Sequence, residues 1–225
     1  MNSVNETQEP DTLNRWLAIG GMAAAILFIP TAFVIGETRA GYSHVSQGIS
    51  ALSESGAPAA WAQSANFIIL GVLTIGLAVG LQRGISHGKG SIVGPALIGA
   101  FGLLAGIGNG IFRSDPVGAP ETLIGTLHSL TAGLGFVAVI LSMFILPRRL
   151  RYDENWTHLA GIGRWMGAAA SILMVVYLMA QEGTVEVWEP WTGLFQRALG
   201  ASVMLWLFLL ALRLYQTSRI EAPTV

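Results

Sequence analysis

Six runs of apolar residues, each long enough to cross a lipid bilayer, make up most of this sequence. A helix needs roughly 20 residues to cross about 30 Å of hydrocarbon. The fifth run, 165–180, is short unless 159–164 extends it, and the sixth, 191–214, has Arg197 near its start. The first four runs contain no Asp, Glu, Lys or Arg and cover 16–35, 59–81, 92–112 and 123–146. The pattern predicts six membrane-spanning segments.

The same runs indicate helices rather than strands. Lipid offers backbone groups no hydrogen-bond partners, so only α-helices and closed β-barrels span membranes. Barrel strands alternate apolar and polar side chains, and these runs do not. Composition agrees, because 52% of the 225 residues are hydrophobic and 11% are charged, against about 25% charged in soluble domains. We therefore predict an all-α membrane protein, a bundle of six transmembrane helices.

Little of the chain is left outside these spans. Residues 15–215 are predicted to form a single transmembrane domain, with disordered cytoplasmic tails at 1–14 and 216–225. The first tail lacks the basic segment of a cleaved secretory signal, and the run behind it is longer than the apolar part of a signal. The first span is therefore expected to be retained. The chain has no cysteine, which excludes disulfides, thiolate nucleophiles and Cys-ligated metals.

Basic residues are distributed unevenly between the two sides of the predicted bundle. If the N-terminus is inside, nine of the 12 Lys and Arg residues lie on the inner side and three on the outer side. Basic residues concentrate in cytoplasmic loops, so we predict both termini in the cytoplasm and a location in the cell (inner) membrane. The net charge of −1 argues against a nucleic-acid partner. The expected partner is the lipid bilayer.

Glycines in the third run indicate close helix packing. Gly102, Gly106 and Gly110 recur at every fourth residue and lie on one face of a helix. Helices in lipid associate where small residues let their backbones approach. We expect this face to pack inside the bundle, with the third span at its centre, rather than to form a dimer. The oligomeric state stays open.

The first outer loop, residues 36–58, has an amphipathic pattern. Tyr42, Val45, Ile49 and Leu52 follow helical spacing, and serine and glutamine fill most positions between them. The spacing predicts an amphipathic helix that lies at the outer interface or over the mouth of the bundle.

The same loop carries a family resemblance. It reads Tyr-Ser-x-x-Ser-x-x-Ile-Ser-x-Leu-Ser-Glu-x-Gly-Ala-Pro over residues 42–58, and further matching segments follow at 112–116, 125–128 and 193–197. In the order and spacing of these segments, from about Arg15 to Leu214, the chain resembles the bacterial and archaeal membrane proteins grouped as domain of unknown function 998. The resemblance implies six spans and no established activity, so it supplies no catalytic residues.

Polar residues at the outer helix ends are the candidates for chemistry. Ionisable groups at membrane depth cost about 2.5–3.5 kcal/mol at a helix centre, less near an end, and often mark a site. The favoured interpretation is structural, with Arg197 paired to Asp115 or Glu121 and His128 bonded to a loop carbonyl. The functional hypothesis is one outer polar pocket, covered by the amphipathic helix, that binds a small solute or lipid. Its members would be His44, Asp115, His128, Gln196 and Arg197.

Other activities compete with simple binding. A carrier is suggested by Pro30 and Pro95 inside their spans, since transporters often contain broken helices. A metal-dependent hydrolase acting on an outer-face lipid is the alternative, because His44, Asp115 and His128 could hold a metal with one open position. A haem protein would use four histidines that lie mostly in loops. Whether the protein is an enzyme stays open, and no cofactor or resident metal is predicted.

A small basic cluster lies on the inner side. Arg148, Arg149 and Arg151 follow Pro147 at the end of the fourth run. Such a cluster beside a membrane attracts anionic lipid headgroups.

Overall fold

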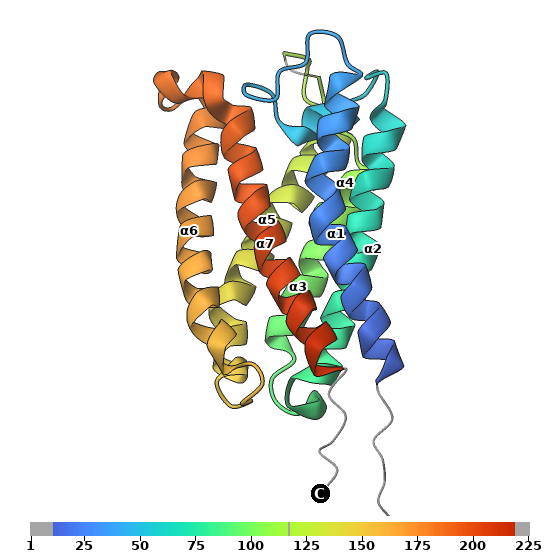
Figure 1. Ribbon diagram of the computed structural model, residues 1–225. Coiled ribbons are helices and arrows are strands. Elements are labelled where there is room, and N and C mark those ends of the chain that lie inside the picture. The colour runs from blue at the N-terminus through green and yellow to red at the C-terminus, as the bar shows by residue number, and fades with distance from the viewer. Residues whose placement is uncertain (1–10, 117, 219–225) are drawn as a thin grey trace, which may run out of the picture.

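The computed structural model describes residues 11–116 and 118–218, and in these residues all the regular structure is helical. Six helical segments are long and apolar enough to cross a membrane, as the sequence predicts. Figure 1 shows them side by side as one bundle. The spans are α1 (Thr12–Glu37), α2 (Ala60–Gly84), the third span, α5 (Leu123–Leu150), α6 (Thr157–Gln181) and α7 (Thr192–Thr217). The third span consists of α3 (Val93–Phe101), the π-helical turn η3 (Gly102–Gly108) and α4 (Asn109–Ile111).

The spans form a ring in sequence order. Each packs against the next one along the chain, and α7 returns to pack against α1. The start of α1 and the end of α7 lie together (Figure 1), and we call this the terminal end. The opposite end, the loop end, carries the loops 38–59, 112–122 and 182–191. These loops contain two short 3₁₀ helices, η1 (Ile49–Ser53) and η4 (Glu186–Trp191), and a third, η2 (Ile85–Gly88), lies in the α2–α3 connection at the terminal end.

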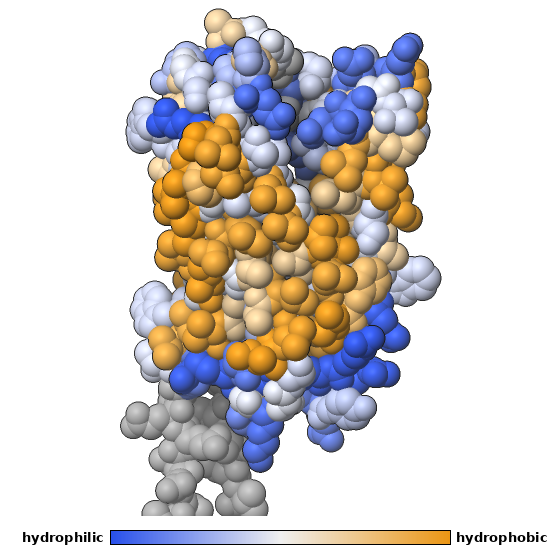
Figure 2. Space-filling model, turned by 180° about the vertical axis from the view of Figure 1, so that it is seen from behind, coloured by the Kyte–Doolittle hydropathy of each residue, from blue (hydrophilic) through white to orange (hydrophobic). Residues whose placement is uncertain are grey.

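The surface of the bundle is apolar around its middle and polar at both ends. Figure 2 shows this apolar band on one face, with hydrophilic groups above and below it. Large apolar side chains on the band are strongly exposed, among them Leu27 at 58%, Val72 at 54% and Ile172 at 65%. A water-soluble protein would not leave such a belt uncovered, whereas lipid solvates it. The chain is therefore a multi-pass membrane protein.

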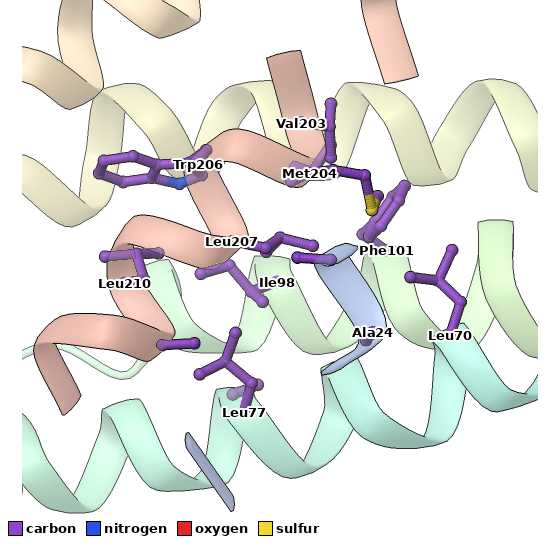
Figure 3. Close-up of a cluster of buried hydrophobic side chains, with 14 of the residues drawn as sticks. Ala24, Leu70, Leu77, Ile98, Phe101, Val203, Met204, Trp206, Leu207 and Leu210 are labelled. Carbon is purple, nitrogen blue, oxygen red and sulfur yellow. The ribbon is translucent and has the colours of Figure 1, made fainter. Parts of the chain in front are cut away.

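The apolar interior is packed where side chains of α7 meet those of α2 and α3. Leu207 and Leu210 of α7 lie close to Leu77 of α2 and Ile98 of α3 (Figure 3), and all four are fully or almost fully enclosed. The third span packs mainly on α2 and α5 and is a member of the ring. Our expectation that it lies at the centre is therefore wrong, because a central span would pack on most of the other spans and not mainly on its two neighbours.

The glycines of the third span nevertheless pack inside the molecule, as predicted. A Cβ atom on Gly106 would lie 2.4 Å from the Cα of Gly71 in α2, and one on Gly102 would lie 2.7 Å from the Gly71 carbonyl oxygen. A Cβ atom on Gly110 would lie 2.7 Å from the Ser64 carbonyl oxygen. The two helices meet backbone to backbone, which only glycine permits.

The helices extend slightly beyond the predicted domain. The backbone N–H of Asn14 donates to the Asp11 carboxylate at 3.0 Å, so Asp11 caps α1 and the helix begins at Thr12. At the other terminus α7 continues to Thr217. The predicted tails are thus wrong for residues 12–14 and 216–217. The rest of both tails lies outside the described residues, apart from Asp11 and Ser218.

The predicted amphipathic helix over 42–52 does not form. Turns occupy 44–46, and only the 3₁₀ helix η1 follows, over Ile49–Ser53. The reason is that the carbonyls of Gln47 and Gly48 accept hydrogen bonds from the Tyr42 hydroxyl, while the carbonyl of His44 accepts from Arg197. Side chains thus take carbonyls that an α-helix would use for its own N–H groups.

Candidate functional site

Arg197 of α7 organises the loop end by binding the loop between α1 and α2. We call residues 38–58 the first-loop cap. One terminal nitrogen of Arg197, Nη1, donates to the carbonyl oxygens of His44 at 2.7 Å and Gln47 at 2.8 Å. The other, Nη2, donates to the Tyr42 hydroxyl at 2.7 Å. A guanidinium suits this position because its donors fan out in a plane and stay charged.

The neighbouring residues of α7 complete the attachment of the cap. The Gln196 side chain accepts from the N–H of Ile49 at 2.5 Å and donates to the Tyr177 hydroxyl of α6 at 3.0 Å. The N–H of Leu194 donates to the Val45 carbonyl at 2.9 Å. A Cβ atom on Gly193 would lie 2.4 Å from the Gln47 carbonyl oxygen, so the cap rests directly on the helix backbone.

His44 links Arg197 to an acidic side chain. Its Nδ1 lies 3.1 Å from Arg197 Nη2, and its Nε2 lies 3.0 Å from the Glu37 carboxylate. Because Arg197 can only donate, Nδ1 must accept, and Nε2 carries the proton that it donates to Glu37. The geometry therefore fits the tautomer that carries its proton on Nε2. The ring also stacks on Phe33 with centroids 4.2 Å apart.

Tyr42 is held as a neutral phenol. Burial raises its pKa above the usual value, and the hydrogen bond from Arg197 opposes that rise only in part. The hydroxyl can therefore donate to the Gly48 carbonyl at 2.8 Å while it accepts from Arg197.

Asp115 and His128 belong to a second cluster at the loop end. Asp115 accepts from both the N–H and the hydroxyl of Thr122, each at 2.8 Å, and so fixes the start of α5. His128 Nδ1 lies 2.8 Å from the Phe112 carbonyl oxygen, which makes it a donor there. The expectation that His128 bonds a loop carbonyl is confirmed.

The expected ion pair between Arg197 and an outer carboxylate is not formed. Asp115 is bonded to Thr122, and Glu121 accepts from the Thr126 hydroxyl at 3.1 Å. Within the described residues, Arg197 instead meets carbonyls, a hydroxyl and an imidazole. The structure thus brings His44, Gln196 and Arg197 together and places Asp115 and His128 in the other cluster.

A metal centre built from His44, Asp115 and His128 does not fit this arrangement. His44 lies in the cluster of Arg197, away from Asp115 and His128, and no group of three His, Asp or Glu side chains in the described part of the chain could hold a metal ion. The hydrolase alternative therefore loses its proposed ligand set.

The terminal end contains a feature that the sequence did not predict, a cavity of about 650 Å³ between α5 and the α2–α3 connection. Its walls combine apolar side chains, such as Val93 and Ile145, with three cationic ones. It is lined by Ser86, Lys89, Gly90, Ser91, Val93, Gly94, Ile145, Leu146, Arg148, Arg149 and Tyr152. The basic cluster after Pro147 was visible in the sequence, but not the hollow beside it.

Arg149 is the structural cation of this cavity. It is only 6% exposed, and its terminal nitrogens donate to the side chain of Gln82 at 2.5 Å and to the carbonyls of Ile85 at 2.5 Å and Ser91 at 3.2 Å. Its Nε is buried and has no partner among the described residues. A Cβ atom on Gly90, in the cavity wall, would lie 3.4 Å from that nitrogen.

Lys89 and Arg148 line the same cavity but are not used by the fold. Both are exposed, and neither side chain forms a hydrogen bond or ion pair with another described residue. The turn before Lys89 is strained, because Ser86 and His87 both have positive φ, of 50° and 48°. Each left-handed non-glycine residue costs roughly 1–2 kcal/mol. Asp153 opposes this strain by accepting from the Ser86 N–H at 2.6 Å.

Comparison with known proteins identifies the family and no activity. The family described as "Protein of unknown function (DUF998)" matches residues 22–213, so the chain belongs to it, as the resemblance implied. No curated protein and no solved structure matches the chain. Any functional conclusion therefore rests on the geometry described above.

Proposed function

We propose that this membrane protein binds an anionic phospholipid at its terminal end. The observation that carries the proposal is the 650 Å³ cavity with two exposed cations, Lys89 and Arg148, that no described residue neutralises. A lipid phosphate would lie between these two side chains. The Tyr152 hydroxyl, at the rim, can supply a further donor.

The shape of the cavity suits a lipid better than a soluble anion. Its inner wall is apolar and includes Val93, Ile145 and Leu146. Those residues continue into the apolar surface of α3 and α5, where an acyl chain can follow the helices. Basic pockets between helices at the membrane surface are typical sites for acidic headgroups.

The predicted orientation of the bundle determines which leaflet supplies the bound lipid. If the terminal end is cytoplasmic, as the distribution of Lys and Arg favours, the bound lipid comes from the cytoplasmic leaflet of the cell membrane. That leaflet carries much of the acidic lipid of many membranes.

Binding is tested on the full chain in detergent, by native mass spectrometry with added dioleoyl phosphatidylglycerol or dioleoyl phosphatidylcholine. We expect the acidic lipid to bind more tightly. Lys89→Gln and Arg148→Gln should each weaken its binding about fivefold, the effect of one charge near a membrane surface. Arg113→Gln is the matched control, since Arg113 is exposed and unpaired within the described residues at the loop end. Equal binding of the two lipids, or variants that bind like wild type, would refute the proposal.

A solute site at the loop end is the second candidate. The observation in its favour is that the Arg197 guanidinium has no carboxylate partner among the described residues. His44, Gln196 and Arg197 would form the site, and Asp115 and His128 would lie beside it. Phosphate that raises the melting temperature of wild type and of Arg148→Gln, but not of Arg197→Met, would support it. If phosphate has no effect on wild type, Arg197 has a structural role alone.

A further inference from the structure

A second hollow lies on the other side of the end of α5. It has a volume of about 260 Å³ and is formed between α5 and α6. Phe144 and Pro147 supply an apolar floor, and Arg148, Arg151 and Arg164 surround it. The first cavity lies between α5 and the α2–α3 connection, so the last turn of α5 separates the two hollows.

Arg148 lines both hollows. Arg148 and Arg151 are three positions apart on a helical backbone, so their side chains are neighbours on its surface. Arg164 faces them from α6. Like that of Lys89, the exposed side chains of Arg151 and Arg164 form no hydrogen bond or ion pair with the part of the chain that is described. The first hollow therefore has one unpaired cation of its own and the second has two, and the hollows share Arg148.

We infer that the preferred ligand is a lipid with two phosphate groups, bound astride the end of α5. One phosphate lies between Lys89 and Arg148, and the other lies between Arg151 and Arg164. This inference rests on the proposed function and names the class of lipid. Four unpaired cations line the two hollows, two for each phosphate, so a ligand with two phosphate groups can place one phosphate in each hollow.

The apolar parts of the two hollows favour a lipid over a soluble diphosphate. Phe144 is 38% exposed in the second hollow, and Val93 is 46% exposed in the first. Trp165, next to Arg164, is 80% exposed at the same level, the position of a side chain that anchors at the membrane interface. Acyl chains would cover these surfaces, and pyrophosphate would not.

The test compares tetraoleoyl diphosphatidylglycerol with dioleoyl phosphatidylglycerol on the full chain by native mass spectrometry. We expect wild type to prefer the two-phosphate lipid by at least about tenfold, since each added charge pair contributes roughly fivefold. Arg151→Gln and Arg164→Gln should each weaken binding of the two-phosphate lipid about fivefold and leave binding of the one-phosphate lipid unchanged. Lys89→Gln should weaken the binding of both lipids, and Arg113→Gln should weaken the binding of neither. Millimolar pyrophosphate should displace neither lipid.

The outcomes separate this inference from the proposed function. If both lipids bind with the same affinity, and Lys89→Gln weakens both, the one-phosphate site stands and the two-phosphate ligand is refuted. If Arg164→Gln weakens both lipids equally, the second hollow does not hold a second phosphate, and the inference also fails. Displacement by pyrophosphate would show that a soluble anion is the ligand and would overturn both.

Discussion

The two ends of the bundle use arginine in opposite ways. At the loop end, Arg39 forms an ion pair with Glu54 and donates to the Ala51 carbonyl at 2.6 Å, and Arg197 donates to the carbonyls of the first-loop cap. At the terminal end, Arg151 and Arg164 have no such partner among the described residues. Arg39 and Arg197 use their charges in folding, as Arg149 does at the terminal end, whereas Arg151 and Arg164 leave theirs available. The same residue type therefore serves in this molecule either as a structural element or as a candidate ligand contact.

The largest expected effect is the loss of Arg197. Arg197→Met should lower the free energy of unfolding by about 3 kcal/mol, because several charge-assisted hydrogen bonds are lost and buried carbonyls are left without donors. The matched change at the other end, Arg164→Met, should stay within about 0.5 kcal/mol of wild type. Unfolding by sodium dodecyl sulfate in mixed micelles measures both. Equal effects of the two changes would remove the contrast between the ends.

A smaller effect is expected where the cap rests on α7. Gly193→Ala places a methyl group 2.4 Å from the Gln47 carbonyl oxygen, and such overpacking costs about 2 kcal/mol. Gly133→Ala is the control, because a Cβ atom there meets nothing within 4 Å, and alanine stabilises a helix by up to about 1 kcal/mol. The same unfolding assay applies. A Gly193→Ala protein as stable as wild type would show that the cap is loosely attached.

A still smaller effect concerns the coupling between the two loop-end clusters. In a double-mutant cycle, Arg197→Met and Asp115→Asn should be additive within about 0.5 kcal/mol, because the two side chains share no partner in the described structure. A coupling energy above 1 kcal/mol would restore the ion pair that the sequence suggested, and would contradict the separate clusters.

The last prediction concerns which end is cytoplasmic, and it uses single cysteine substitutions that should leave stability unaltered. The chain has no cysteine, so a single cysteine at the exposed position Ser46 or Glu154 is a clean probe. An impermeant maleimide on intact cells should label Ser46→Cys and spare Glu154→Cys. The reverse pattern would place the lipid site in the outer leaflet.

The spans were predictable because lipid imposes a single rule on the backbone. Every backbone group in hydrocarbon needs an internal partner, so a long uncharged run such as 123–146 has to become a helix. The packing of Gly106 was predictable for a related reason, since close approach in lipid requires small side chains. The place of the third span in the ring was not predictable, because helical periodicity shows which face packs but not which helix it meets.

The partners of Arg197 illustrate what the sequence could not show. We looked for a carboxylate because charge favours one, yet the backbone carbonyls of His44 and Gln47 lie closer. Carbonyls occur at every residue, so they leave no signal in the sequence. The cavity beside Arg148 was hidden for a similar reason. It depends on how the turn at Ser86 bends away from α5, which is decided by the hydrogen bonds of Arg149 and Asp153.

The π-helical turn in the third span sets the rotational phase of the segment that follows it. A turn closed by i→i+5 hydrogen bonds holds an additional residue, and each residue corresponds to about 100° of rotation in an α-helix. A regular α-helix with the same number of residues would therefore turn Asn109 away from Thr131, whose hydroxyl donates to it at 2.8 Å. Deleting one residue within Gly102–Gly108 removes the additional residue together with the wide turn, so the loop-end half of the span keeps its orientation. The loss of one residue should thus be better tolerated at this turn than within the regular helices α2 and α5, where it rotates everything that follows by about 100°.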